Sequence, residues 1–240
     1  MPDNLPQNLK LGIDALRHKG LNLFAVMSVR RLPDQAIESL TRLNPLLSDD
    51  SRIILIGHGG KTLWERLSAE AQPGPDPIDH YSGEAALRFS QEVLPPGTYQ
   101  LLYPGDSPIS LQRLGTIAGW HNPSPLGIGI HPQWGLWYAY RAVILTNEPL
   151  PEILQPTPPS PCAACHEKPC LSVCPAGALA EDKMIDRERC AHYRLGSDSR
   201  CGDRCVARWS CPVSTDQRYT LEQVQYHYRL SLETLRHYYS

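Results

Sequence analysis

The stretch CAACHEKPCLSVCP, residues 162–175, carries four cysteines with the spacing C-x2-C-x4-C-x3-C-P. A known ligand run for iron–sulfur clusters has the spacing C-x2-C-x2-C-x3-C-P, so only the middle gap differs. In that run three neighbouring thiolates bind one cubane, while the fourth cysteine, before the proline, binds a second cluster. The spacing therefore predicts iron–sulfur ligation, with the last cysteine serving a different cluster from the first three.

All eight cysteines of the chain lie between Cys162 and Cys211, and the 161 residues before them contain none. Because no export signal is visible, a reducing compartment is expected, where metal ligation is favoured over disulfides. Eight thiolates match two [4Fe-4S] clusters with four ligands each. We predict that one cluster is bound by Cys162, Cys165, Cys170 and Cys211, and the other by Cys174, Cys190, Cys201 and Cys205. Two alternatives stay open at this point: two structural zinc sites, or buried thiols without metal.

Arginines surround the second cysteine group, interleaved with acidic residues. They are Arg187, Arg189, Arg194, Arg200, Arg204 and Arg208. Cationic side chains near cluster sulfurs raise the reduction potential, so some of them are candidates for tuning it. The alternative is ordinary solvated surface charge.

The 240 residues, of which 41% are hydrophobic, suffice for one medium domain or two small ones with a buried core. Before the cysteines, segments with helical periodicity alternate with short apolar segments. Helices are predicted over 8–18, 33–43, 61–70 and 78–93, and strands over 21–29, 52–56, 98–103 and 135–146. This alternation predicts an α/β (α+β) sandwich.

Four regions are predicted along the chain. Residues 1–148 form an α/β domain that binds a cofactor or substrate. Residues 149–161 form an extended linker, because six prolines there exclude helix and central strand. Residues 162–219 form a ferredoxin-like bis-[4Fe-4S] module, and residues 220–240 form a C-terminal helix with Thr220 as its N-cap.

Charge and hydropathy restrict the expected partners. The chain has 23 Lys and Arg against 25 Asp and Glu, so no global positive field would attract nucleic acid or anionic lipid. No apolar run approaches the roughly 18 to 20 residues needed to cross a bilayer. A cytoplasmic protein without membrane insertion or nucleic-acid partner is expected.

Several motifs resemble known families. Ala118-Gly119, the segment HPQWGLW at 131–137, a strand, a Pro-rich linker and the cysteine run resemble the core of epoxyqueuosine reductase, over residues 106–212. Further motifs are similar to those of small bacterial ferredoxin-like two-cluster proteins and extend the likeness over nearly the whole chain. They are IGHGGKTLW at 56–64, SPLG at 124–127, IHP at 130–132 and Tyr140-Arg141.

The first resemblance implies a nitroreductase-like, cobalamin-processing-like α/β domain that binds cobalamin and receives electrons from paired [4Fe-4S] clusters. It places Asp106 near the proton-donating aspartate of that family, as the candidate for a catalytic residue. The family's G-W-x-G-K-N segment is replaced here by HNPSP at 121–125, which puts the corrin contacts in doubt. A tRNA substrate is not expected, because the charge is near neutral and no helical-repeat region follows the cysteines.

Other residues are candidates for binding a cofactor, either cobalamin or a flavin. Trp134 and Trp137 flank His131 and are expected either to wall a pocket for a flat ligand or to pack in the core. The segment Gly57-His58-Gly59 follows a predicted strand, and its backbone is expected either to approach a ligand or to form a plain turn. Tyr138 and Arg141, on the last predicted strand, complete the set.

The leading hypothesis is an iron–sulfur reductase. Electrons from a soluble donor, such as a ferredoxin, a flavodoxin or a reductase, would pass through both clusters. They would reach a corrinoid or a small-molecule substrate in the N-terminal domain. One alternative is a non-enzymatic electron carrier or adaptor without corrinoid, and another is a zinc-stapled interaction protein.

Overall fold

The computed structural model describes residues 5–44, 47–69, 76–156, 159–181 and 183–239. The chain divides into two units. The first takes in residues 1–121 and 138–158, and the second takes in residues 122–137 and 159–240. Residues 122–137 thus group with the cysteines rather than with the rest of 1–148. The physical reason is that the backbone at Gly135 packs closely against the backbone at Val213. A Cβ atom added at Gly135 would lie only 2.7 Å from the Val213 carbonyl oxygen.

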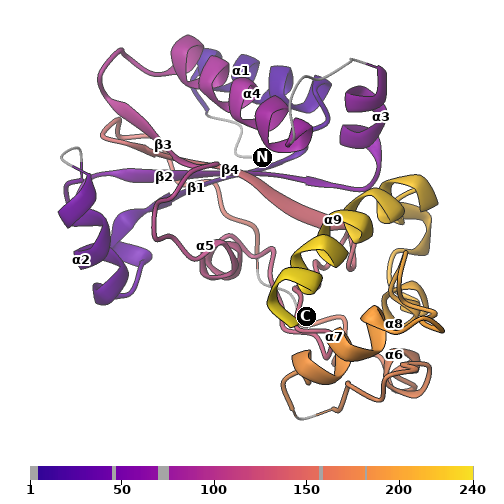
Figure 1. Ribbon diagram of the computed structural model, residues 1–240. Coiled ribbons are helices and arrows are strands. Elements are labelled where there is room, and N and C mark those ends of the chain that lie inside the picture. Colours follow the sequence, from indigo (N-terminus) through magenta and orange to yellow (C-terminus); the bar gives the residue numbers. More distant parts are fainter. Residues whose placement is uncertain (1–4, 45–46, 70–75, 157–158, 182, 240) are drawn as a thin grey trace. The chain divides into compact units, whose positions relative to one another are not determined.

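A four-stranded antiparallel sheet forms the middle of the first unit (Figure 1). The strands are β1 (Leu23–Ser28), β2 (Arg52–Gly59), β3 (Tyr99–Tyr103) and β4 (Tyr138–Thr146), in the order β1-β2-β4-β3. The two inner strands are apolar on both faces, and residues 53–56 and 142–145 are fully buried. Such continuous apolar strands require cover on both sides of the sheet.

Helices supply that cover. In Figure 1, α1 (Gln7–His18), α3 (Thr62–Ala69) and α4 (Pro77–Val93) lie over one face, and α2 (Asp34–Leu43) and α5 (Leu111–Ile117) lie over the other. In α1, the buried residues Leu9, Ile13 and Leu16 recur at the spacing of one helical face. This unit has a mixed α and β fold, in agreement with the predicted class.

The predicted helices and strands of this unit form within a few residues of their expected bounds, but one prediction was wrong. The segment Gly57-His58-Gly59 does not follow β2; it forms the end of β2. After a bulge beyond Ile56, β4 continues to pair with it, so that Gly57 lies opposite Tyr140 and Gly59 opposite Tyr138. The short helix α5 and the 3-10 turn Val29–Arg31 were not predicted.

The Pro-rich segment 149–161 contains no helix among its described residues; Ile153 forms a single β-bridge, a turn begins at Pro161, and residues 157 and 158 lie outside the described residues. Ile153 exchanges two backbone hydrogen bonds with Val26 of β1, at 2.9 and 3.0 Å. Glu152 accepts two hydrogen bonds from the Arg31 guanidinium, both 2.7 Å long. The segment therefore covers the outer edge of β1, where unpaired backbone groups would otherwise be open to another chain.

The second unit consists of short helices and turns. Its helices are α6 (Pro169–Ser172), α7 (Arg187–Leu195), α8 (Val206–Trp209) and α9 (Leu221–Tyr239), with a 3-10 turn at Thr215–Gln217. The predicted N-cap of the last helix is confirmed, because Thr220 Oγ1 accepts a hydrogen bond from the Gln223 N–H at 3.2 Å. Across the described residues, no helix combines the length and the apolar character needed to cross a membrane.

Candidate metal centres

Four cysteines of the second unit line one cavity of about 20 Å³. They are Cys162, Cys165, Cys170 and Cys211. The other walls are mainly apolar, and Ile130 and Leu136 form a buried cluster with Cys211. Lys168 also lines this cavity and forms an ion pair with Glu181.

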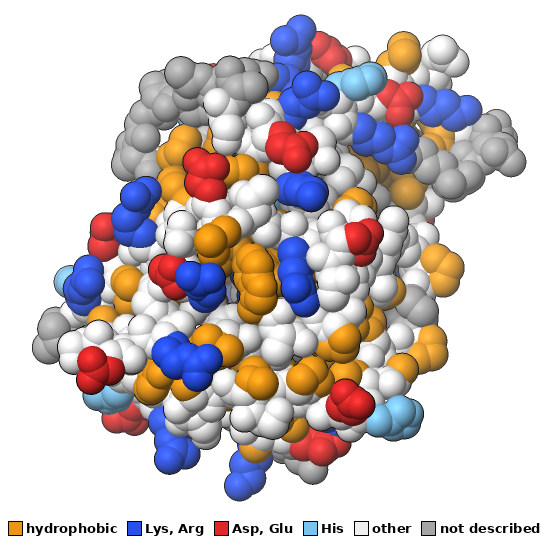
Figure 2. All heavy atoms as spheres, turned by 90° about the vertical axis from the view of Figure 1, so that its right-hand side faces the viewer, with side chains coloured by type: hydrophobic (Ala, Val, Ile, Leu, Met, Phe, Trp, Pro, Cys, Tyr) orange, Lys and Arg blue, Asp and Glu red, His pale blue; other side chains and the backbone are white. Residues whose placement is uncertain are grey.

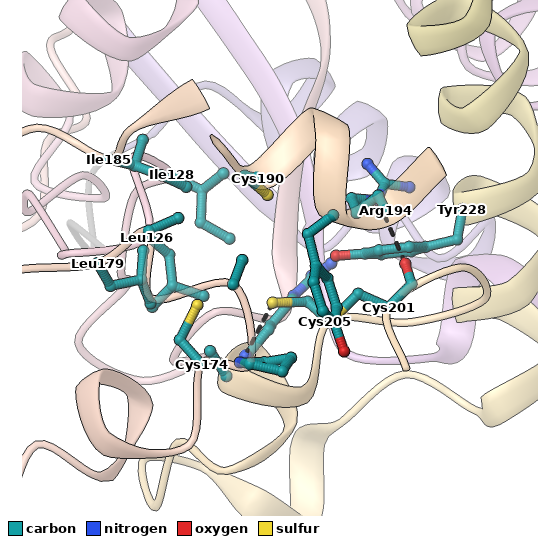
Figure 3. Close-up of a pocket in the computed structure, with 16 residues that line it drawn as sticks. Leu126, Ile128, Cys174, Leu179, Ile185, Cys190, Arg194, Cys201, Cys205 and Tyr228 are labelled. Carbon is teal, nitrogen blue, oxygen red and sulfur yellow. Dashed lines mark hydrogen bonds between the residues drawn. The ribbon is translucent and has the colours of Figure 1, made fainter. Parts of the chain in front are cut away.

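The other four cysteines line a second cavity, of about 160 Å³ (Figure 3). They are Cys174, Cys190, Cys201 and Cys205. Side chains of Leu126, Ile128, Leu179 and Ile185 make one side of the cavity apolar, while Arg194 and Tyr228 lie on the other (Figure 3). We call these two groups of cysteines the first set and the second set.

The two sets have the same membership as the two groups predicted from the spacing. All eight cysteines are free of disulfide bonds, so every sulfur retains its capacity to bind metal. Iron ligation by these sulfurs stays a prediction.

Helix starts and turns position the cysteines. Cys205 is the N-cap of α8, and its Sγ accepts a hydrogen bond from the Arg208 N–H at 3.3 Å. The backbone N–H groups of Val206 and Val213 lower the pKa of the Cys201 and Cys211 thiols against the effect of burial. Backbone donors of this kind stabilise the charge of a thiolate, which is the form that binds metal.

The thiols of each set act electrostatically on one another. Burial, together with the nearby sulfurs of Cys211, Cys170 and Cys165, raises the pKa of Cys162 to about 11. In the second set, burial and the sulfurs of Cys205, Cys174 and Cys201 raise the pKa of Cys190. A cation bound among the four sulfurs would remove this repulsion, and ligation would release the protons.

The donor chemistry of each set fits a [4Fe-4S] cluster. Four thiolates are the usual ligands of such a cluster, and each set places four cysteines around its own cavity. Among the described residues, no three His, Cys, Asp or Glu side chains are arranged to hold one metal ion.

The six arginines near the second set separate into different roles. Arg194 and Arg208 line the second cavity. Arg208 also packs its guanidinium against the Trp137 ring, 4.4 Å from the centroid, and donates to the Leu136 carbonyl at 2.6 Å. Arg204 pairs with the neighbouring Asp203, and the other three are exposed surface residues.

In the first unit, two of the cofactor candidates belong to a buried polar network. His58 is 1% exposed, and its Nδ1 accepts a hydrogen bond from Arg141 Nε at 3.2 Å. Arg141 in turn donates to Asp79 of α4 at 3.3 Å. This network ties α4 to β2 and β4, so the contacts seen for His58 and Arg141 are internal to the unit.

The two glycines of β2 also have internal roles. A Cβ atom at Gly57 would lie 2.8 Å from the Ala139 carbonyl oxygen and 3.2 Å from the Trp120 ring, so Gly57 permits close packing. Gly59 exchanges hydrogen bonds of 2.8 and 3.0 Å with the Asn22 side chain. Both glycines are explained by packing within the unit.

Tyr138 is part of a group that sequence reasoning missed. Its hydroxyl lies 3.4 Å from His121 Nδ1 and 3.3 Å from the Tyr140 hydroxyl, which itself lies 3.3 Å from His121 Nδ1. Burial lowers the pKa of His121 and raises the pKa of Tyr140, so imidazole and phenol stay neutral at physiological pH. The alternation of β4, which places Tyr138 and Tyr140 on one face, was the available signal.

The remaining candidates lie in turns or in the core. His131 Nδ1 accepts hydrogen bonds from the backbone N–H groups of Gln133 and Trp134, at 3.0 and 3.2 Å, and burial lowers the pKa of His131 to about 4. Trp137 is fully buried and packs with Tyr219 in the core of the second unit. Asp106 is exposed in the turn after β3.

No protein-family model matches the chain, and no curated protein matches its sequence. Solved structures match it at 14–15% identity. One is epoxyqueuosine reductase with an epoxyqueuosine-modified tRNA-Tyr stem loop; its TM-score is 0.57 at 14% identity, over 92% of this chain and 69% of the other. Another is epoxyqueuosine reductase from Bacillus subtilis, with a TM-score of 0.55 at 14% identity, over 90% of this chain and 68% of the other.

A selenomethionine-labelled epoxyqueuosine reductase matches as well, with a TM-score of 0.53 at 15% identity, over 91% of this chain and 69% of the other. The chain thus has the mixed α and β fold of these epoxyqueuosine reductase structures. This agrees with the first of the two resemblances seen in the sequence, at the level of the fold.

Proposed function

We propose that the protein is a two-cluster iron–sulfur reductase. The first set of cysteines would hold one [4Fe-4S] cluster and the second set another. When bound, such clusters supply one-electron transfer at potentials set by their surroundings. A soluble donor such as a ferredoxin, a flavodoxin or a reductase would provide the electrons.

One observation carries this proposal: eight cysteines, none in a disulfide, lie in two sets of four, each around its own cavity. The surroundings of the sulfurs support it. Apolar side chains such as Leu126 and Ile185 keep water from the second set. Backbone N–H groups and the Arg194 charge stabilise thiolates there, because each of them lowers the thiol pKa against the effect of burial.

Anaerobic reconstitution with iron and sulfide tests the proposal. The expected product is brown, absorbs broadly near 400 nm and holds about eight irons per chain, since each cubane has four. Cys162→Ser and Cys211→Ser should each lose the same half of the iron, and the double variant should lose no more. Cys174→Ser should lose the other half.

Ser172→Ala is a suitable control, because this residue lies between Cys170 and Cys174 and its hydroxyl bonds only locally, to the Pro169 carbonyl at 3.1 Å. It should retain all the iron. A colourless protein with about two zinc ions per chain would instead establish the zinc-stapled interaction protein.

The electron acceptor would be a corrinoid, a flavin or a small-molecule substrate. The resemblance of the sequence motifs to epoxyqueuosine reductase implies an acceptor of this kind, and the match in fold is consistent with it. Because the contacts seen for the cofactor candidates are internal, we assign no residue to a corrinoid. Adding cobalamin or a flavin to the iron-loaded protein under reducing conditions, and recording the cofactor spectrum, tests this step.

A second candidate function is an electron carrier or adaptor without corrinoid. Ser124 and Pro125, from the segment that replaces G-W-x-G-K-N, line the cavity of the first set. That position favours a role in covering cysteines over a role in holding a corrin. Intact clusters together with unshifted cobalamin and flavin spectra would support the carrier.

The surface charge supports a protein or small-molecule partner rather than nucleic acid. On the face shown in Figure 2, Lys and Arg side chains are interspersed with Asp and Glu, and hydrophobic side chains lie among them. Nucleic-acid binding usually relies on a continuous basic surface.

A further inference from the structure

We propose that Tyr228 tunes the second cluster: its phenol donates a hydrogen bond to Cys205 Sγ and thereby raises the reduction potential of the cluster that the second set would hold. This inference rests on the proposed function, and it assigns a role to a residue of α9, outside the cysteine segment.

The position of Tyr228 carries the inference. Tyr228 lines the second cavity together with the four cysteines of the second set. Figure 3 shows its ring reaching from α9 into the cavity, beside Arg194 and close to Cys205. The hydroxyl lies near enough to the Cys205 sulfur for the two groups to interact electrostatically, and that sulfur accepts a hydrogen bond from the Arg208 N–H at 3.3 Å.

Arg194 holds the tyrosine in place. Its guanidinium lies over the Tyr228 ring, 4.6 Å from the centroid. The same guanidinium donates to the Cys201 carbonyl at 3.3 Å and to Ser231 Oγ of α9 at 2.7 Å. One side chain of α7 thus joins the cysteine loop to α9, and it fixes the phenol relative to the sulfurs.

The sign of the effect follows from charge. Reduction adds one electron to a cluster, and part of the added negative charge resides on the sulfurs. A hydrogen bond donated to a ligand sulfur therefore stabilises the reduced state more than the oxidised state, and the potential rises. The apolar side of the cavity strengthens this interaction, because apolar surroundings have a low local dielectric constant and screen it less.

Tyr228→Phe tests the inference, because it removes the hydroxyl and leaves the ring under Arg194. Tyr226→Phe is the matched control: it makes the same change two residues earlier on α9, at a side chain that does not line the cavity. Both variants and the wild type are loaded with iron anaerobically, titrated with dithionite and followed by electron paramagnetic resonance.

We expect Tyr228→Phe to lower one of the two cluster potentials and leave the other in place, with iron content unchanged. The expected shift is at least a threefold change in the ratio of reduced to oxidised cluster at fixed potential; a tenfold change corresponds to about 59 mV for one electron. Tyr226→Phe should shift neither potential.

Failure of this inference differs from failure of the proposed function. A wild type that takes up no iron refutes the clusters themselves. Iron-loaded Tyr228→Phe with both potentials unchanged refutes the tuning role and leaves the clusters standing. If Tyr228→Phe does not retain iron, replacing Tyr228 with 3-fluorotyrosine provides the test, because the more acidic phenol is a stronger hydrogen-bond donor. One of the two cluster potentials should then rise, and two unchanged potentials would overturn the inference.

Discussion

Acid sensitivity of the second unit should depend on His131. This side chain is 1% exposed, and its Nδ1 accepts two backbone N–H hydrogen bonds, from Gln133 and Trp134. Both bonds require an unprotonated Nδ1, and burial lowers the pKa of His131 from 6.5 to about 4. The folded protein therefore resists protonation of a group that the unfolded chain protonates readily.

The size of the effect follows from these two pKa values. The stabilisation is fully present above pH 6.5 and is lost as the pH falls toward 4, because the unfolded state then binds the extra proton. Between pH 7 and pH 5 the loss amounts to about 2 kcal/mol, and at pH 4 and below it approaches roughly 3 kcal/mol, at about 1.36 kcal/mol per pKa unit.

His131→Asn isolates this contribution. The asparagine Oδ1 accepts the same two N–H groups, as in an Asx turn, but does not titrate. We expect wild type and variant to have similar free energies of unfolding at pH 7. Between pH 7 and pH 5, the free energy of unfolding should fall by about 2 kcal/mol less in the variant than in the wild type.

Urea unfolding of the iron-loaded protein under anaerobic conditions, followed by tryptophan fluorescence, measures the difference. Trp137 is fully buried in the same unit and should report on its unfolding. Parallel pH profiles for the two proteins would refute the reasoning, because they would mean that His131 titrates alike in the folded and unfolded states.

Two further predictions concern packing and capping. Gly115→Ala should destabilise the first unit by about 1–3 kcal/mol, because a Cβ atom there would overlap the Tyr140 phenol. The same change in a Tyr140→Leu background should cost much less in urea unfolding, and an equal cost in both backgrounds would contradict the explanation. Thr220→Ala should lower stability by about 1 kcal/mol by removing the hydrogen bond to the Gln223 N–H at the start of α9, whereas Thr220→Ser should retain it. Urea unfolding of the two variants measures this, and equal losses would show that the hydroxyl does not cap the helix.

Local patterns explain how much of the fold was predictable. The 3.6-residue periodicity of α1 and α4 and the apolar runs of β2 and β4 are properties of short segments, and these elements form close to their expected bounds. The N-cap of α9 was predictable for the same reason, because Thr220 acts on an amide only three residues away.

The sequence also predicts how the cysteines group. The C-x2-C-x4-C-x3-C-P spacing, with its crossing of the fourth cysteine, predicts the two groups that lie around the two cavities. Short loops leave few ways for closely spaced cysteines to converge, so the spacing restricts which sulfurs meet.

Contacts between distant segments were not predictable from local patterns. The last residues of β2 form a strand because β4, about eighty positions later, supplies the partner for their backbone groups. The sequence makes Gly57, His58 and Arg141 candidates for binding a cofactor. In the folded unit, Gly57 packs against Trp120 and Ala139, and Arg141 bonds to both His58 and Asp79.

The residues alone thus determined the class of fold and the two sets of thiols, since periodicity and spacing act over a few positions. The tertiary structure alone decided what surrounds those thiols: residues 122–137 join the cysteine unit, and Tyr228 of α9 lines the cavity of the second set together with Cys205. A contact between two side chains that are distant in the sequence depends on where packing holds their two backbones, and no pattern within either segment predicts that position.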